Sequence, residues 1–145
     1  MKLYVVDTNI VFTTAMNTES LIGQYLMKRD NTQSLLYAPT YLTIEMRRHF
    51  DKLVRLSGLS PSATQEIIEL AYKQITFIDD AQIPFPAYAE AAKLVRDVDP
   101  EDINFVALAI HLSCELWTGD RQLYRHLLSK GFTQVVSFED VRAGL

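Results

Sequence analysis

The sequence predicts an α/β protein, a three-layer α/β/α sandwich with a central, mostly parallel five-stranded sheet. Short apolar runs typical of strands alternate with helical patterns along the whole chain. The runs are continuous rather than alternating, as expected for strands that are covered on both faces. No internal repeat, low-complexity tract or Gly/Ser-rich linker divides the 145 residues, so we expect a single domain over residues 1–145.

Each predicted strand is a short run rich in apolar, β-forming residues. The strands are expected at residues 3–6, 34–38, 76–78, 115–118 and 134–137. The helices follow from apolar residues at three- and four-residue spacing and from local start and stop signals. Pro39 suits a first helical turn, Gly58 lies beyond a helix end, and Ser60-Pro61 suits a cap with the first helical residue. The helices are expected at residues 8–16, 18–28, 39–56, 61–75, 86–96, 99–113 and 121–129.

Composition limits the function classes. The 14 basic and 18 acidic residues give a net charge of −4, which is unusual for a protein that binds nucleic acid through a broad basic face. The single cysteine, Cys114, excludes a disulfide framework and an all-cysteine zinc site. The longest apolar run, residues 105–110, is far too short to span a membrane, and the broken apolar N-terminus does not suit a signal peptide. We expect a soluble, cytoplasmic protein.

Two aspartates directly follow predicted strands. Asp7 follows the first strand, and Asp120 follows the fourth in the sequence Thr118-Gly-Asp. Ligands of open parallel sheets bind at the carboxyl ends of the strands, where both aspartates are expected. Both also precede helices, so ordinary helix capping is an equally good interpretation of each one alone.

Glu45 shares a face with the apolar residues of its helix, being three residues after Leu42 and four before His49. The apolar stripe comprises Leu42, Met46, His49, Leu53 and Leu56. A carboxylate on a buried face must be paired, protonated or bound to a metal ion. A buried ion pair, or a place at the edge of the stripe, is the alternative.

Asp102 extends the buried stripe of the next helix, which includes Phe105 and Val106, by one turn. Asp99 can cap this helix and Pro100 can be its first residue, which leaves Asp102 free to point inward. Complementation of the helix dipole is the alternative role for Asp102.

The four acids lie at or near the starts of four helices, and such points converge on one edge of a parallel sheet. Clustered carboxylates repel one another unless they hold a hard divalent cation, and an all-oxygen site favours Mg²⁺ or Mn²⁺ over zinc. The sequence lacks the glycine-rich loops of the common nucleotide-binding folds and the Gly-x-Ser-x-Gly turn of serine hydrolases.

Together, four pieces of the chain resemble the PIN-domain nuclease family. They are Val5-Val6-Asp7-Thr8-Asn9-Ile10, Glu45 within Leu42-Thr-Ile-Glu-Met-Arg-Arg, Asp102 within Glu101-Asp-Ile-Asn-Phe-Val-Ala-Leu-Ala, and Thr118-Gly-Asp120. The resemblance extends from residue 3 to about residue 138. It implies a PIN-like fold and a metal-dependent ribonuclease with Asp7, Glu45, Asp102 and Asp120 as the catalytic, metal-binding quartet. One or two Mg²⁺ or Mn²⁺ ions would activate a water for phosphodiester cleavage. Asn9 and Thr118 match the polar positions that support the ligands.

The resemblance also suggests partners. Small stand-alone bacterial and archaeal members are mostly VapC-type toxins of toxin–antitoxin pairs, so we expect an RNA substrate, a small antitoxin and a homodimer. Candidate apolar residues for the dimer are Ala63, Ile67, Leu70 and Ile75, although internal packing explains them equally well.

Several basic residues are candidates for contacts with RNA phosphates. Arg47, Arg48, Lys52 and Arg55 follow Glu45, and Arg121 follows Asp120; a solvated outer face is an equally good interpretation of the first group. Two other functions stay open: a catalytically silent PIN-like binding module, and a DNA-directed flap-type nuclease. The second is disfavoured because the sequence shows no helical arch or helix-hairpin-helix extension. RNA and single-stranded DNA are not distinguished by these residues.

Overall fold

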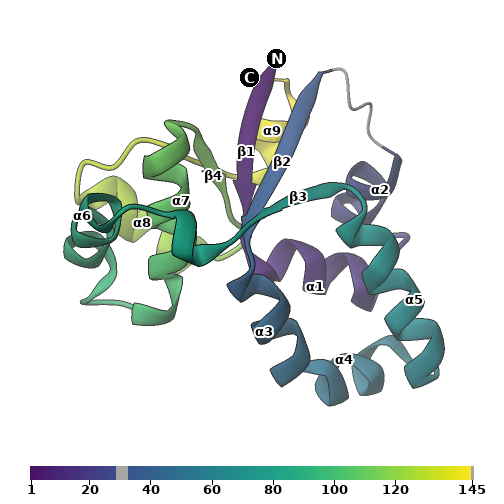
Figure 1. Cartoon of the computed structure of the whole chain (residues 1–145). Coiled ribbons are helices and arrows are strands. Elements are labelled where there is room, and N and C mark those ends of the chain that lie inside the picture. The colour runs from purple at the N-terminus through teal and green to yellow at the C-terminus, as the bar shows by residue number, and fades with distance from the viewer. Residues whose placement is uncertain (29–32, 145) are drawn as a thin grey trace.

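The computed structural model describes residues 1–28 and 33–144 and contains a five-stranded, all-parallel sheet (Figure 1). Across the sheet the strand order is β3-β2-β1-β4-β5. The strands are β1 (Lys2–Val6), β2 (Ser34–Pro39), β3 (Ile75–Ile78), β4 (Glu115–Trp117) and β5 (Val135–Val136). The strand bounds agree with the sequence prediction to within one residue, and the predicted α/β/α sandwich is confirmed.

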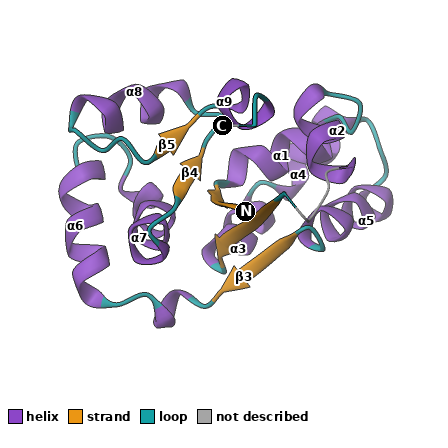
Figure 2. Ribbon diagram, turned by 90° about the horizontal axis from the view of Figure 1, so that it is seen from above, coloured by secondary structure: helices purple, strands orange, loops and turns teal. Residues whose placement is uncertain are grey.

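Helices cover both faces of the sheet (Figure 2). One face is covered by α1 (Thr8–Met16), α2 (Leu21–Lys28), α4 (Phe50–Ser57), α5 (Pro61–Tyr72) and α9 (Phe138–Arg142). The other face is covered by α6 (Phe85–Val95), α7 (Ile103–Leu112) and α8 (Arg121–Ser129). Helix α3 (Tyr41–Arg48) continues from the carboxyl end of β2 and packs against α1. Two 3₁₀ turns, η1 (Asp80–Gln82) and η2 (Pro100–Asp102), precede α6 and α7. Because both faces are covered, Tyr4, Val5 and Val6 of the central strand are buried.

The direction of strand progression reverses at β1. The chain adds β2 and β3 on one side of β1 and then crosses back to place β4 on the other side. Val6 pairs with Trp117, and the Asp7 N–H donates to the Trp117 carbonyl at 3.2 Å, so β1 and β4 end side by side. A reversal of this kind is where open parallel sheets bind their ligands.

The predicted start of a helix at Pro39 is wrong, because Pro39 is the last residue of β2 and pairs with Ile78. The Thr40 N–H bonds to the Ile78 carbonyl at 3.0 Å, so by alternation the missing N–H of Pro39 faces β1. Pairing between β1 and β2 ends at Tyr37, so the strand loses no hydrogen bond there.

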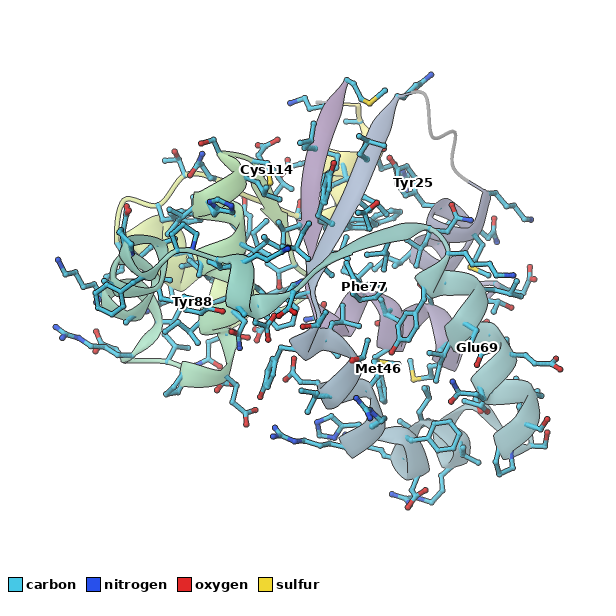
Figure 3. The ribbon with its side chains drawn as sticks, in the orientation of Figure 1. Tyr25, Met46, Glu69, Phe77, Tyr88 and Cys114 are labelled. Atoms are coloured by element: carbon cyan, nitrogen blue, oxygen red, sulfur yellow. The ribbon has the colours of Figure 1, made fainter. Side chains whose placement is uncertain are left out.

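The predicted helix over residues 39–56 is two helices, α3 and α4, because the backbone at His49 leaves the helical region (φ −105°, ψ 13°). The change of direction lets α4 pack against α1 and α5. Leu42, Met46 and Leu53 remain in the core, and Met46 points from α3 towards α5 (Figure 3). The other two members of the predicted stripe, His49 and Leu56, are exposed.

Three further details differ from the prediction. Helix α2 begins at Leu21 rather than residue 18, and Leu21 is exposed. The buried face of α5 contains Thr64, Ile68 and Ala71, whereas Ile75 belongs to β3. Helix α9 was not expected, although Ser137 and Asp140 form a capping box at its start. Within the described residues, no helix combines the length and the apolar character needed to cross a membrane.

Candidate active site

A cavity of about 240 Å³ lies at the carboxyl end of β1, between the segments that follow β2 and β4. Six of the site residues predicted from the sequence line this cavity: Asp7, Asn9, Glu45, Lys52, Asp102 and Asp120. The cavity is completed by Thr8, Phe12, His49 and Phe105. The four acids from four separate segments therefore face one space, as their positions on the sheet edge predicted; their role as metal ligands stays a prediction.

Asp7 is the most buried of the four acids, with 4% of its surface exposed. Its Oδ2 accepts a hydrogen bond from the Thr118 hydroxyl, whereas its Oδ1 is buried without a hydrogen-bond partner in the described part of the chain. Burial is the main cause that raises the pKa of Asp7 to about 8; the nearby Asp102 and Asp120 add to it, and the Thr118 bond opposes it. Asp7 does not cap α1 with its side chain, so the helix-cap alternative does not apply to it.

Glu45 reaches the cavity from α3 and is held by α1. The Thr8 hydroxyl donates to Glu45 Oε1 at 2.5 Å, joining residues from the ends of two neighbouring strands. Burial raises the pKa of Glu45, and the Thr8 bond partly offsets that effect. Thr8 follows Asp7 directly in the chain, so one short segment supplies the first acid and positions the second.

Asp102 is the last residue of η2, where its side chain makes no capping bond to α7. Asp99 takes the capping role instead, because its Oδ1 accepts from the Glu101 N–H at 2.9 Å. Burial and then the charge of Asp99 are the main causes that raise the pKa of Asp102 to about 7, and Asp120 and Glu45 contribute further. The start of α7 is anchored to α6, since the Tyr88 hydroxyl donates to Asn104 Oδ1 at 2.9 Å (Figure 3).

Asp120 differs from the other three acids. It is exposed, and its Oδ1 accepts from the backbone N–H groups of Gln122 at 2.9 Å and Leu123 at 3.1 Å. The capping interpretation is therefore correct for one carboxylate oxygen of Asp120. The Asp120 side chain therefore both caps α8 and lines the acidic cavity.

Asn9 and Thr118 connect the ends of β1 and β4. Thr118 donates to Asp7 and accepts from the Asp120 N–H at 3.0 Å, so it links two of the acids. Asn9 Oδ1 accepts from the Gly119 N–H at 2.9 Å. A Cβ at position 119 would lie 3.0 Å from that oxygen, which explains why a residue without a side chain suits this position.

The predicted basic residues are spread over different surroundings. Lys52 lines the acidic cavity, but Arg47 and Arg48 lie on the exposed side of α3. Arg48 donates to the Tyr41 hydroxyl at 3.1 Å and to Glu101 Oε1 at 3.3 Å. Arg121 lines a neighbouring cavity instead. His49 also lines the acidic cavity, which the sequence did not predict because the helical spacing assigned His49 to the apolar stripe.

The donor set suits a hard cation. In residues 1–28 and 33–144, no group of three or more Asp, Glu, His or Cys side chains is arranged so that it could hold a metal ion. Mg²⁺ does not need such a group, because proteins commonly hold it with one or two carboxylates and leave the other positions to water and substrate phosphates. The buried, unpartnered Oδ1 of Asp7 is the polar atom that most needs such an ion.

Comparison with known proteins gives a family and a fold. The sequence model of the family described as the PIN domain matches residues 5–140. VapBC2 from Rickettsia felis, solved bound to a DNA fragment from its promoter, is similar with a TM-score of 0.63 and 15% identity over 93% of this chain and 96% of that chain. PAE2754 from Pyrobaculum aerophilum has a TM-score of 0.67 and 16% identity over 97% of this chain and 86% of that chain. VapBC-1 from nontypeable Haemophilus influenzae has a TM-score of 0.65 and 15% identity over 94% of this chain and 98% of that chain. No curated protein matches.

Proposed function

Because this chain belongs to the PIN-domain family, we propose that it is a nuclease that cuts the phosphodiester bonds of RNA endonucleolytically with Mg²⁺ or Mn²⁺. The observation that carries the proposal is the cavity at the strand reversal, where acids from four segments face one space. Two of these acids have pKa values raised to about 8 and about 7, mainly by burial, so the described protein does not compensate the charge of their ionised forms. A divalent cation supplies that compensation.

Asp7, Glu45, Asp102 and Asp120 surround the position that we propose for the cation; one or two of them would hold it directly, with water in the other positions. When bound, the cation would activate a water and stabilise the negative charge that develops on the phosphate oxygens. Thr118 and Thr8 orient the carboxylates of Asp7 and Glu45 through their hydroxyl hydrogen bonds, as supporting groups around metal sites commonly do.

The remaining cavity residues have simpler tasks. Lys52 places a positive charge at the cavity, where it would attract a substrate phosphate. Phe12 and Phe105 contribute apolar surface to the cavity wall.

We further propose that the protein is the toxin of a toxin–antitoxin pair and that a small antitoxin protein binds it. The names of two similar structures, VapBC2 and VapBC-1, support this proposal, and the chain covers 96% and 98% of those chains. Induction of the wild-type gene should arrest growth, and induction of Asp7→Asn should not. Growth arrest by the inactive variant would contradict a nuclease toxin.

A homodimer is also proposed. Of the four apolar residues suggested by the sequence, only Leu70 is substantially exposed, with 48% of its surface accessible. Leu56 and Leu59, at 53% and 42%, extend the exposed apolar surface near the junction of α4 and α5. Light scattering at micromolar concentration should give twice the monomer mass, and a monomer would contradict the dimer.

The nuclease activity is tested with a 5′-labelled single-stranded RNA and a DNA of the same sequence, each with Mg²⁺, with Mn²⁺ and with EDTA. We expect cleavage of the RNA with either metal and none in EDTA. Asp7→Asn should abolish cleavage, whereas the matched control Asp51→Asn should retain it, because Asp51 is exposed and lines no cavity described above. Cleavage that persists in EDTA, or in the Asp7→Asn variant, would contradict the proposed chemistry.

A further inference from the structure

A second and larger cavity, of about 400 Å³, lies next to the acidic one. The two cavities share Asp120, which lines both. The floor of the second cavity is the segment from Thr118 to Asp120, and its walls come from α2, α8 and the start of α9. A chain-like ligand that leaves the acidic cavity over Asp120 therefore enters this space.

The α8 wall of the second cavity is basic. Arg121 and Arg125 are at positions i and i+4 of α8, so they project from the same face of the helix. Neither forms an ion pair within the described part of the chain, and both are exposed. Two acids also line this cavity: Glu139, which lies on α9, and Asp120, whose Oδ1 accepts hydrogen bonds from the backbone N–H groups at the start of α8.

The same cavity includes an aromatic ring, that of Tyr124, which packs partly against the hydrophobic core and is partly exposed. Tyr124 lies between the two arginines and makes no ring contact with another aromatic residue of the described chain. Phe138, on the opposite wall, is fixed by packing against Trp117 and Tyr25, with ring centroids 6.1 and 5.9 Å away. The cavity thus combines a rigid wall, a partly exposed aromatic ring and two guanidinium groups that form no ion pair with the described residues.

Building on the proposed nuclease function, we propose that this second cavity binds the nucleotide adjacent to the cleaved bond of a single-stranded RNA. Arg121 and Arg125 hold its phosphate, and Tyr124 stacks on its base. Unpaired arginines beside an aromatic ring are the groups that proteins use to bind single strands, since the arginines contact the backbone and every base has a face that can stack. Within a protein of net charge −4, the two arginines would supply positive charge close to the acidic cavity.

The test measures binding apart from cleavage. A fluorescein-labelled single-stranded RNA of twelve nucleotides is titrated with protein in EDTA, and the anisotropy is recorded over a range of salt concentrations. The variants are R121A/R125A, Y124L and Y124F, with R96A as the matched control because Arg96 is an exposed arginine that lines neither cavity. Thermal melting of each variant confirms that it folds.

The expected results separate charge from stacking. R121A/R125A should bind at least tenfold more weakly, and the slope of log K against log salt should flatten by roughly 0.7 for each phosphate that the protein no longer neutralises. Y124L should weaken binding by roughly 5- to 100-fold with the slope unchanged, and Y124F should bind as the wild type does. R96A should change neither quantity.

The subsite and the nuclease function fail in different ways. If R121A/R125A and Y124L bind RNA as tightly as R96A does, the proposed subsite is wrong, whether or not the wild type cleaves RNA. The same result is expected if the cavity binds a protein segment instead of RNA. If the variants weaken binding as expected but the wild type never cleaves RNA with Mn²⁺, the subsite stands and the nuclease function fails.

Discussion

Asp7→Asn should change how the stability of the cation-free protein depends on pH. The pKa of Asp7 rises from 3.8 to about 8 on folding. Below pH 3.8 both the folded and the unfolded chain hold the proton, and above about pH 8 neither does. Between these values the folded protein holds a proton that the unfolded chain has released, so the free energy of unfolding falls by about 1.4 kcal/mol for each pH unit. By pH 7 the loss from this one group is about 4 kcal/mol.

In the Asp7→Asn variant this loss of stability at high pH is absent, and the substitution itself destabilises the folded state by a smaller amount. The asparagine Oδ1 can still accept the Thr118 hydrogen bond that Asp7 Oδ2 accepts. Its amide nitrogen takes the place of the buried oxygen that has no partner in the described structure. An unsatisfied buried donor costs about 1–3 kcal/mol. The variant should therefore be more stable than the wild type at pH 7 by about 1–3 kcal/mol, and about equal to it near pH 5.

Urea unfolding in EDTA at pH 5, 6, 7 and 8 measures this directly. The wild-type curve should fall more steeply with pH than the Asp7→Asn curve, and the difference should approach one proton. Asp51→Asn, the exposed control, should run parallel to the wild type. Parallel wild-type and Asp7→Asn curves, or a variant less stable than the wild type at pH 8, would refute the assignment of the raised pKa to Asp7.

Three further predictions concern the surroundings of the acids. Asp120→Ala should lower the free energy of unfolding by about 1 kcal/mol, because α8 loses its N-terminal cap. Asp120→Asn should keep the cap but lose cleavage of RNA. Equal stability of the two variants in urea would contradict the capping role. Gly119→Ala should lower both the melting temperature and the cleavage rate, since its Cβ would lie 3.0 Å from Asn9 Oδ1. Arg48→Ala should leave the melting temperature unchanged, because Arg48 and Glu101 are both more than half exposed, so any loss of RNA affinity would report the lost charge.

The strands were predictable from sequence because a strand that is buried on both faces consists of consecutive apolar residues. Tyr4, Val5 and Val6 are all apolar and all buried, and no polar residue interrupts them. The acids were predictable for the complementary reason. Glu45 and Asp102 continue apolar stripes in which a carboxylate needs an explanation, and the structure places both at the cavity.

Pro39 and His49 were mispredicted because local signals permit two outcomes there. Proline suits the end of a strand as well as the start of a helix, and pairing with Ile78 in a distant segment decides between them. His49 fits the helical spacing of its neighbours, but the packing of α4 against α1 and α5 turns the backbone there. Such decisions depend on tertiary contacts that periodicity does not contain.

The hydrogen bonds that hold the acids were equally invisible in the sequence as contacts. Thr8 and Glu45 are 37 residues apart, and Asp7 and Thr118 are 111 residues apart. Only the strand order brings them together, because β1 lies between β2 and β4. The second cavity has the same origin, since its walls come from α2, α8 and α9.

Under the proposed function, a proton and a divalent cation would compete for Asp7. Up to about pH 8 the folded protein keeps the proton, so a cation that uses the ionised carboxylate must displace it. Its affinity then rises with pH, by about tenfold per unit for each proton displaced, over the same range in which the cation-free protein loses stability. A ligand that binds only the folded state stabilises it in proportion to the logarithm of its concentration over Kd. The stabilisation by Mn²⁺ should consequently be largest at the pH values where the cation-free protein has the lowest free energy of unfolding. Cation binding would thus explain why Asp7 has a buried Oδ1 without a hydrogen-bond partner in the described structure.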